Sequence, residues 1–374
     1  MTAKLFYKQI KRLLWVIPVF TLTLCLTIFV NAPAKANILS CHALLQESNS
    51  EQTRSYSEIK ELKFMAFNVE NLFVSTGKTE WTSIGVQKSI IKKPPQPKPE
   101  HDIEKVRAII KEELPDVLII TEVESQTALE YLAKNSLQGL YKSFLIEGND
   151  GRGIDIGFLV KSDLPFLVEH QTHRDIKWFD PVDKQTVKLF SRDVPALLLR
   201  KSANENPFLI ILGNHAKSKR DRPGDPESFL WRKAQYEGIA KIVQNYAVQY
   251  AKVPIILGGD FNTEVNTAAE IQPLLSLLKS GFNLTDNSTP LSERITHTYH
   301  PRDGPVQQHQ MDDIKVSPEL ADKIIEARIY RYKNADGTIM PFARTFAERN
   351  RQPSDHLPVK IRISTSGLWS PIEK

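Results

Sequence analysis

The chain has 374 residues, of which 41% are hydrophobic and 25% are charged. These are ordinary values for a globular protein, and the length suffices for one large domain or two modest ones with a proper core. The composition therefore excludes collagen-like and wholly disordered proteins.

The formal net charge of +5 comes from the N-terminus. Five of the 49 basic residues lie in the first 36 residues, which contain no Asp or Glu, so 44 basic residues face 44 acidic ones in the rest of the chain. Without that segment the chain would be formally neutral. Net charge therefore says nothing about an anionic partner, and only local clusters of charge can.

The N-terminus has the three parts of an export signal. A basic stretch through Arg12 precedes an apolar run at Leu13–Val30, and Ala34-Lys35-Ala36 follows as a small-x-small cleavage pattern. Residues 1–36 are therefore predicted to be a signal peptide. The alternative is an uncleaved membrane anchor, because the apolar run approaches the length that spans a bilayer. Pro18 and several threonines interrupt the run and favour cleavage.

Both cysteines lie at this end of the chain, Cys25 in the apolar run and Cys41 just after it. Cleavage would leave Cys41 alone, so no intrachain disulfide could form. We expect a secreted or periplasmic protein with no stable membrane association after cleavage, whereas an uncleaved segment would anchor it to the membrane. No obligate protein partner is evident from the sequence.

Residues 37–61 are rich in Ser, Gln and Glu and are predicted to form a polar lead-in. The folded domain is predicted at residues 62–364, with a C-terminal tail at residues 365–374. Its first strand starts at Leu62 and ends in Asn68. The proline-rich stretch at residues 92–99 must be a surface loop, because proline continues neither a helix nor a central strand.

Helical and strand-like patterns alternate after this loop. Residues 103–114 carry apolar side chains at helical spacing, and Pro115 ends that helix. The longest helical pattern covers residues 227–250. Short apolar runs, typical of buried strands, cover residues 117–120, 156–160, 196–199, 208–212 and 254–257. One domain is the simplest interpretation, since no internal repeat or later linker is visible.

Acidic, amide and imidazole side chains recur where these strands begin or end. They are Asn68, Glu122, Asn214, His215, Asp260, Asn262, Asp312, Asp313, Asp355 and His356. An α/β architecture gathers its active site at such strand ends. Each residue alone is explained as a turn residue, because Gly, Asp and Asn favour turns. Turn chemistry does not explain the whole set in this order.

In this order the residues resemble the endonuclease/exonuclease/phosphatase superfamily, whose fold is that of deoxyribonuclease I. The matching segments are Phe67-Asn68-Val69-Glu70-Asn71-Leu72-Phe73, Thr121-Glu122-Val123-Glu124, Arg152-Gly153-Ile154-Asp155, Asn214-His215-Ala216-Lys217-Ser218-Lys219, Gly259-Asp260-Phe261-Asn262, Met311-Asp312-Asp313-Ile314 and Ser354-Asp355-His356. The first segment is similar to a bacterial extracellular-nuclease-like branch. The resemblance implies an α/β fold: a four-layer sandwich of two packed mixed β-sheets flanked by helices.

The resemblance also implies which residues hold the metal and the phosphate. Asn68 and Glu122 would bind the divalent ion, with Asp355 as a further ligand. Asp260 and Asn262 would position the attacking water and the scissile phosphate.

Three further residues would bind the phosphate or move protons. His356 would act as the general base and Asp312 would orient it. His215 would bind the phosphate or protonate near it. Asp313 adjoins Asp312, so which of the two carboxylates faces the base stays open.

The physical chemistry agrees with this assignment. Phosphodiesters repel nucleophiles, so their hydrolysis needs a cation that neutralises charge on the phosphoryl oxygens. Amide and carboxylate oxygens suit Mg²⁺ or Mn²⁺, with Ca²⁺ also compatible, and the lack of a cysteine cluster argues against structural zinc. An imidazole with a near-neutral pKa is the natural base for water.

A basic cluster follows His215, with Lys217 and Lys219 as expected contacts for substrate phosphate. Its alternative interpretation is a solvated loop. Trp178-Phe179 is interpreted as core, with an exposed contact for a base or a lipid as the alternative. The other histidines have no comparable context and are interpreted as structural: His42, His101, His170, His173, His297, His300 and His309.

These observations predict an exported, metal-dependent phosphodiesterase that acts on nucleic acid. A phosphomonoesterase or a sphingomyelinase-like phospholipid phosphodiesterase is the first alternative, because one fold serves several substrates. A non-catalytic binding protein that retains the fold is the second. The complete set of catalytic residue types speaks against it.

Overall fold

The computed structural model describes residues 44–46, 53–77, 80–81, 89–90, 93–301 and 303–369. The predicted signal peptide and both cysteines lie outside these residues. Residues Leu39–Lys374 form one compact unit. No helix within the described residues combines the length and the apolar content needed to cross a membrane.

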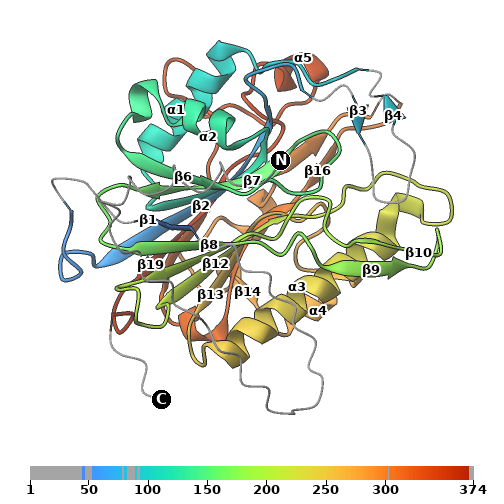
Figure 1. Cartoon of the computed structure of the whole chain (residues 1–374). Coiled ribbons are helices and arrows are strands. Elements are labelled where there is room, and N and C mark those ends of the chain that lie inside the picture. Colours follow the sequence, from blue (N-terminus) through green and yellow to red (C-terminus); the bar gives the residue numbers. More distant parts are fainter. Residues whose placement is uncertain are drawn as a thin grey trace, which may run out of the picture. The chain divides into compact units, whose positions relative to one another are not determined.

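Two mixed β-sheets form the centre of the unit (Figure 1). The first contains, in spatial order, β18 (Ile324–Ile329), β19 (Val359–Ser364), β2 (Glu61–Leu72), β5 (Val117–Val123), β7 (Asp155–Lys161) and β6 (Tyr141–Leu145). The second contains β1 (Leu44–Gln46), β8 (Leu167–Gln171), β11 (Ala196–Arg200), β12 (Leu209–His215), β13 (Ile255–Asp260), β17 (Asp312–Val316) and β14 (Lys279–Ser280).

Helices cover the outer face of each sheet (Figure 1). Those on the six-stranded sheet are α1 (Glu100–Glu113) and α2 (Gln126–Leu132), and those on the seven-stranded sheet are α3 (Phe229–Gln249) and α4 (Gln272–Leu275). The short helix α5 (Phe346–Arg349) lies in a connection. The structure thus confirms the predicted α/β fold with two packed mixed sheets between helices.

Short elements complete the unit. Three antiparallel pairs are β3 (Glu80–Trp81) with β4 (Ser89–Ile90), β9 (Lys177–Asp180) with β10 (Gln185–Lys188), and β15 (His297–Tyr299) with β16 (Gln307–His309). The 3₁₀ helices are Asn135–Leu137, Pro226–Ser228, Ala269–Ile271, Gly281–Asn283, Leu291–Glu293 and Pro318–Leu320. The β3–β4 pair precedes the proline-rich stretch predicted to be a loop, and β1 lies within the predicted lead-in.

The two sheets pack closely where β12 and β13 face the other sheet. A Cβ atom on Gly258 would lie 2.6 Å from Cδ1 of Ile119, and one on Gly213 would lie 2.6 Å from Cγ2 of Ile156. A larger residue at either position would force the facing isoleucine side chain to shift. The core between the sheets is therefore continuous up to the strand ends that carry the polar residues.

Helix α1 begins earlier than the predicted Ile103 because Pro99, with φ −55°, already has a backbone suited to a helix start. Acidic side chains occupy its first turn, where the helix dipole favours negative charge. Leu114 then takes a left-handed φ of 44°, and Pro115 follows. The helix thus ends where the sequence predicted.

Helix α3 begins later than predicted. Glu227 and Ser228 have positive φ values of 54° and 50°, which an α-helix does not accommodate. Asp225 lies before them and accepts a hydrogen bond of 2.7 Å from the backbone N–H of Leu230. This bond satisfies one of the free donors at the helix start and fixes the loop that follows β12.

Candidate active site

Parallel strand pairing brings the first two predicted site residues together. Asn68 on β2 is paired in register with Thr121 on β5, so Glu122 is its near neighbour. Strand β19 runs antiparallel to β2, with Val359 opposite Ala66. The residues just before β19 therefore lie at the end of the sheet where β2 finishes.

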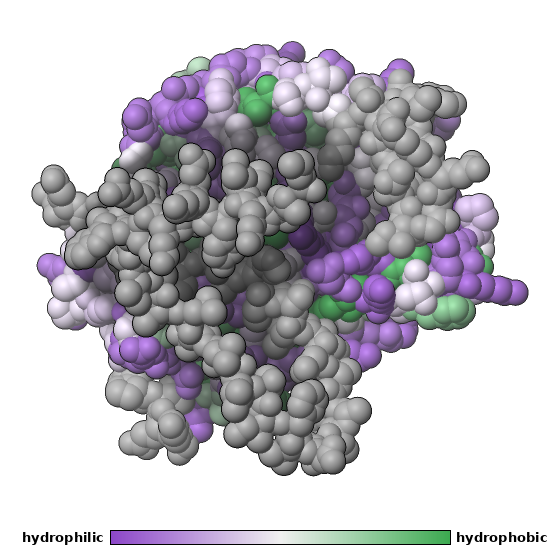
Figure 2. All heavy atoms as spheres, in the orientation of Figure 1, coloured by the Kyte–Doolittle hydropathy of each residue, from purple (hydrophilic) through white to green (hydrophobic). Residues whose placement is uncertain are grey.

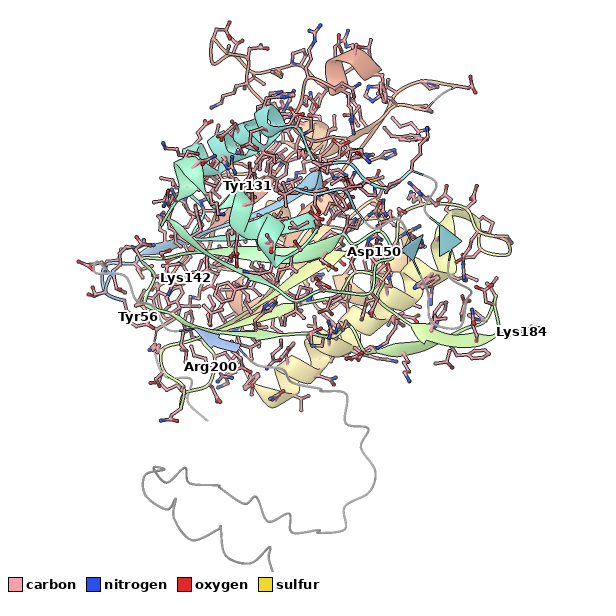
Figure 3. The ribbon with its side chains drawn as sticks, turned by 45° about the horizontal axis from the view of Figure 1, so that its top comes forward. Tyr56, Tyr131, Lys142, Asp150, Lys184 and Arg200 are labelled. Carbon is pink, nitrogen blue, oxygen red and sulfur yellow. The ribbon has the colours of Figure 1, made fainter. Side chains whose placement is uncertain are left out.

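The second sheet contributes its residues in the same way. His215 on β12 is paired with Asp260 on β13, and Asp260 is paired with Asp312 on β17. In Figure 3, Asp150 lies at the opposite end of the sheets from Lys142 and Arg200. Its carboxylate lies 3.2 Å from Nε of Arg192, at the site end.

The backbone is left-handed at several residues of this end. Glu70, Asn71, Glu122 and Asn262 have φ values of 51°, 54°, 66° and 50°. The pairing of β2 with β5 shifts register between Asn68 and Leu72, as in a β-bulge. Such irregularities re-aim side chains that a regular strand would direct into the core or the solvent.

Asp260 lies at the centre of the site and is 1% exposed. Its Oδ2 accepts hydrogen bonds from Nδ2 of Asn68 at 3.1 Å and from Nδ2 of Asn262 at 3.0 Å. Nδ2 of Asn68 also lies 3.5 Å from Oε1 of Glu122. Burial raises the pKa of Asp260 to about 7, and the neighbouring carboxylate of Asp312 adds to the shift.

The donor set of this centre fits a divalent cation. The carboxylates of Glu122 and Asp260 both lie near Asn68, and oxygen ligands of this kind suit Mg²⁺, Mn²⁺ and Ca²⁺ alike. Asn68 presents its amide nitrogen to them, while its oxygen accepts from the N–H of Glu70 at 3.0 Å. Asn68 can therefore serve as a ligand only with its oxygen on the carboxylate side.

His215 is the imidazole nearest these carboxylates. Its Nε2 lies 3.6 Å from Oδ2 of Asp260 and 3.7 Å from Oε1 of Glu122. Burial lowers the pKa of His215 well below its ordinary value, and the cations Arg192 and Arg152 lower it further. His215 therefore contributes no positive charge to these two carboxylates.

His356 and Asp312 form a buried pair. Nδ1 of His356 donates to Oδ2 of Asp312 at 2.7 Å. Its Nε2 faces the site, 3.8 Å from Oδ2 of Asp260 and 4.0 Å from Oδ1 of Asp355. Although burial acts to lower it, the carboxylates of Asp312 and Asp260 raise the pKa of His356 well above its ordinary value.

Asp312, and not its neighbour, contacts the imidazole. Asp313 faces away, since Oδ2 lies 2.8 Å from Nζ of Lys315 and Oδ1 accepts from the hydroxyl of Ser280 at 2.9 Å. The segment before His356 is held by Ser354, whose hydroxyl donates to the backbone oxygen of Asn68 at 2.7 Å.

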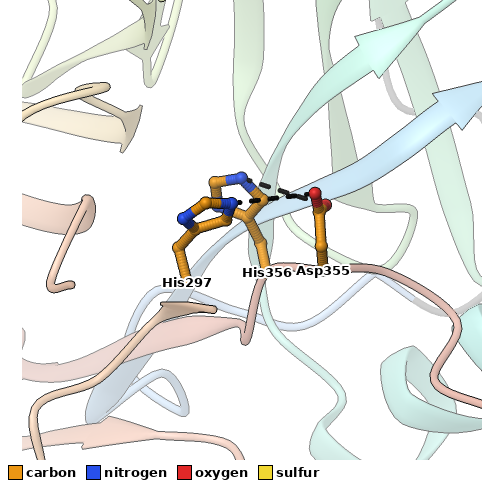
Figure 4. A group of neighbouring side chains, drawn as sticks. All are labelled: His297, Asp355 and His356. Carbon is orange, nitrogen blue, oxygen red and sulfur yellow. Dashed lines mark ion pairs between the residues drawn. The ribbon is translucent and has the colours of Figure 1, made fainter. Parts of the chain in front are cut away.

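Asp355 lies among cationic and imidazole groups. Oδ2 is 3.3 Å from Nη2 of Arg349 and 3.7 Å from Nε2 of His297 (Figure 4). Arg349 also pairs with Glu70. The rings of His297 and His356 lie 4.5 Å apart between centroids. The predicted metal ligand Asp355 thus has its contacts on the histidine side of the site.

The basic cluster after His215 divides in the structure. Lys217 lies near Arg192 and Arg152, and burial together with these cations lowers its pKa to about 8. Lys219 points elsewhere, with Nζ 3.9 Å from Oε2 of Glu227. Lys217 therefore lies with the cations near His215, whereas Lys219 is not brought to the site.

Arg222 belongs to a separate network. It pairs with Asp180 at 2.5 Å and with Asp225 at 3.1 Å, and it stacks on Trp231. Trp178 also packs against Trp231, with 5.8 Å between ring centroids. These contacts join the β9–β10 pair to the start of α3.

The prediction for Trp178-Phe179 as core holds only in part. Trp178 is half-buried against Trp231, but Phe179 on β9 is 59% exposed. Figure 2 shows apolar side chains at the surface over β9 and β10. Successive side chains of a strand point to opposite faces, so Trp178 and Phe179 lie on opposite faces of β9.

Two residues of the site were not anticipated from the sequence. Arg192 lies shortly before β11, and other site residues likewise lie next to the ends of their strands. This position is the signal in the sequence that could have identified Arg192. His297 was interpreted as structural, yet it lies beside His356. No local pattern marks His297, because its place depends on contacts with residues far along the chain.

Comparisons with known proteins agree with this geometry. The sequence profile described as "Endonuclease/Exonuclease/phosphatase family" matches residues 64–365. Among solved structures, truncated Caenorhabditis elegans TDP2 is 18% identical, with 81% of this chain and 98% of that chain covered and a TM-score of 0.54. A second TDP2 structure from C. elegans is 16% identical, with 81% and 75% covered and a TM-score of 0.52.

A third solved structure, Bacteroides thetaiotaomicron mannosyl-6-phosphatase Bt3783, is 15% identical, with 81% of this chain and 99% of that chain covered and a TM-score of 0.48. No curated protein sequence matches significantly. At these identities, the TDP2 structures support the fold alone.

Proposed function

We propose that this chain, which belongs to the Endonuclease/Exonuclease/phosphatase family, is an exported metal-dependent phosphodiesterase that acts on nucleic acid. Family membership makes it a hydrolase of phosphoric ester bonds. The observation that carries the proposal is the 2.7 Å bond from Nδ1 of His356 to Asp312, which directs Nε2 towards the centre of the site. This is the arrangement that a general base for water requires.

The metal would be held by Asn68 and Glu122, with Asp355 as a further expected ligand. A divalent ion held there would supply positive charge to neutralise the charge that develops on the phosphoryl oxygens. Asp260 and Asn262 share a hydrogen bond and lie between this centre and His356. They are placed to orient the attacking water and the scissile phosphate.

The remaining groups act on protons and on substrate charge. Nε2 of His356 takes the proton of water, and Asp312 stabilises the imidazolium that forms. His215 lies beside Glu122 and Asp260 and would contact the phosphate from that side. Arg192 and Lys217 lie next to His215 and favour an anionic substrate.

The test is an assay of the mature chain, from Asn37 onward, with Mg²⁺, Mn²⁺ or Ca²⁺ against four substrates. These are plasmid DNA, RNA, sphingomyelin and inositol phosphates. Cleavage of DNA or RNA that His356→Ala abolishes supports the proposal. Cleavage of sphingomyelin alone, or of phosphomonoesters alone, would show that the substrate is not nucleic acid.

A matched control for this assay is His101→Ala, because the His101 side chain is 71% exposed on α1 and pairs with Asp102, which is not a predicted site residue. It should retain parental rates. Hydrolysis of none of the substrates by a folded, metal-loaded chain would favour the non-catalytic binding protein.

Export is part of the proposal and rests on the sequence of residues 1–36. The exported protein should start near Asn37 and migrate as a monomer with or without reductant. N-terminal sequencing that finds Met1 on the exported protein would contradict cleavage and favour a membrane-anchored form.

A further inference from the structure

We propose that His297, Asp355 and His356 form a second metal site, selective for Zn²⁺-type ions, whose occupation inhibits the enzyme. One ligand atom of each residue lies within 4.8 Å of the other two. The site shares Asp355 with the expected ligands of the oxygen-rich centre, but its two histidines are distinct from Asn68 and Glu122.

The geometry is close to that of a zinc site. Asp355 lies 3.7 Å from Nε2 of His297 through Oδ2 and 4.0 Å from Nε2 of His356 through Oδ1. Both imidazoles present a nitrogen to this carboxylate in Figure 4. Ligands of a tetrahedral Zn²⁺ are about 3.3 Å apart, as follows from Zn–N and Zn–O distances near 2.0–2.1 Å. Ligand atoms that lie up to 4.8 Å apart would therefore have to approach one another by up to about 1.5 Å to close the site.

The two histidines are held in place before any ion binds. His297 and His356 form an isolated backbone β-bridge, and their rings pack at 4.5 Å. The His297 side chain is 13% exposed, and its Nδ1 has no hydrogen-bond partner among the described residues. His297 is therefore fixed by packing and is not committed to another polar contact.

His356 has the neighbour that a zinc-bound imidazole usually has. Its Nδ1–H donates to Asp312, which leaves the lone pair of Nε2 for a metal, and such carboxylate–histidine–metal arrangements orient the ligand. Arg349 competes for Asp355 at 3.3 Å, but it keeps Glu70 as a partner if the carboxylate turns to a metal.

The chemistry of the two sites separates two kinds of ion. Imidazole nitrogen favours zinc, whereas carboxylate and amide oxygens favour Mg²⁺ and Mn²⁺. A Zn²⁺ ion on Nε2 of His356 would occupy the lone pair that accepts the proton of water. The inhibition rests on the proposed function, whereas zinc binding does not.

The binding experiment is calorimetric titration of the metal-free mature chain with ZnCl₂ alone. His297→Phe keeps an aromatic ring against His356 but removes the ligand nitrogen, and His297→Gln serves if that variant fails a circular dichroism check. We expect one zinc per chain, with affinity reduced at least ~10-fold by loss of His297, as for disrupted metal shells.

Two controls locate the ion. Glu122→Gln, in the oxygen-rich centre, and His101→Asn, on the surface, should each leave zinc affinity within about 2-fold of the parent, since neither residue belongs to the proposed set. Unchanged affinity in both His297 variants would overturn the site. So would loss of affinity in Glu122→Gln, which would place zinc at the other centre.

The activity experiment adds Zn²⁺ to enzyme saturated with Mg²⁺. Each variant is compared with its own zinc-free rate. Zinc should inhibit the parent at lower concentration than it inhibits His297→Phe. Equal inhibition of the two would overturn the inhibitory role, while absence of any hydrolysis would bear on the proposed function and leave the calorimetric result standing.

Discussion

The bond between Asp312 and His356 decides which imidazole nitrogen can accept a proton. Because Nδ1 is the donor, Nε2 is the free acceptor, and it faces Asp260. Asp313 next door is engaged by Lys315, so the pair has no competing orientation. At the scale of single residues, the proposed base catalysis depends on whether Asp312 or Asp313 contacts the imidazole of His356.

His356→Ala should lower the rate by the ~10²–10⁴-fold typical of general acid–base catalysis. Asp312→Asn should cost less, because an amide oxygen still accepts the hydrogen bond but stabilises the imidazolium poorly. The double variant should be little worse than His356→Ala, since the two residues act as one unit. Turnover at saturating metal is the measurement. Defects that simply multiply would contradict the pairing.

His170 predicts a pH dependence of stability. It is buried between Phe144 and Phe158, and burial lowers its pKa to about 4. The unfolded chain binds this proton more readily, so the contribution is intact above pH 6.5 and is lost as the pH falls towards 4. The loss amounts to about 3 kcal/mol.

His170→Leu should therefore flatten the free energy of unfolding between pH 6.5 and 4, relative to the parent. Urea denaturation across that range measures it, with exposed His101→Leu as the control. Parallel pH profiles of parent and His170→Leu would show that this imidazole does not remain neutral in the core.

At the scale of elements, strand pairing and loop capping bring each group to the site. Parallel pairing sets Asn68 beside Glu122 and His215 beside Asp260. The loop between β12 and α3 then separates the two lysines, because Asp225 fixes the helix start. Lys217 and Lys219, which the sequence shows only as members of one charge run, therefore lie in different surroundings.

Glu122→Gln should raise the metal concentration that gives half-maximal rate, because it removes a ligand charge at the β2–β5 junction. Excess chelator should abolish hydrolysis, and Mg²⁺ or Mn²⁺ should restore it. Glu124→Gln, two residues on, is the matched control: its carboxylate accepts from the backbone of Val74 instead. Full activity in chelator would refute a metal-dependent reaction.

Lys217→Ala should weaken nucleic-acid binding and flatten its salt dependence by about one charge, whereas Lys219→Ala should have a smaller effect. Because the pKa of Lys217 is about 8, its contribution should also fade in the parent between pH 7 and 9. Binding measured over a salt series at both pH values provides the test. Equal salt dependence of binding in the two variants would indicate instead that both lysines belong to a solvated loop.

Across the whole molecule, the sequence patterns predicted the architecture, and most of the residues that they singled out lie together at one end of the sheets. The apolar runs predicted the central strands, and the polar residues at their ends predicted the end of the sandwich that carries the chemistry. Asp312 could not be separated from Asp313, because alternation in a strand depends on a register that only the partner strand sets.

Residues placed by distant contacts were beyond the sequence patterns. His297 lies beside His356 only because the segment before β17 crosses to the start of β19, and no spacing within either segment reports this. Arg192 could not be predicted as a site residue for the same reason, since its place in the site depends on its proximity to Asp150 and His215. Hydrophobic periodicity predicts which face of a strand or helix carries a side chain, but it does not predict which distant residues contact that side chain.

The left-handed backbone at Glu70, Asn71, Glu122 and Asn262 implies a trade-off between activity and stability. A left-handed conformation costs an ordinary residue about 1–2 kcal/mol, which glycine avoids. Selection for stability alone would favour glycine there, so the polar side chains are retained against a thermodynamic disadvantage. An inactive Glu122→Gly should melt above the parent, whereas Glu130→Gly in α2 should melt below it.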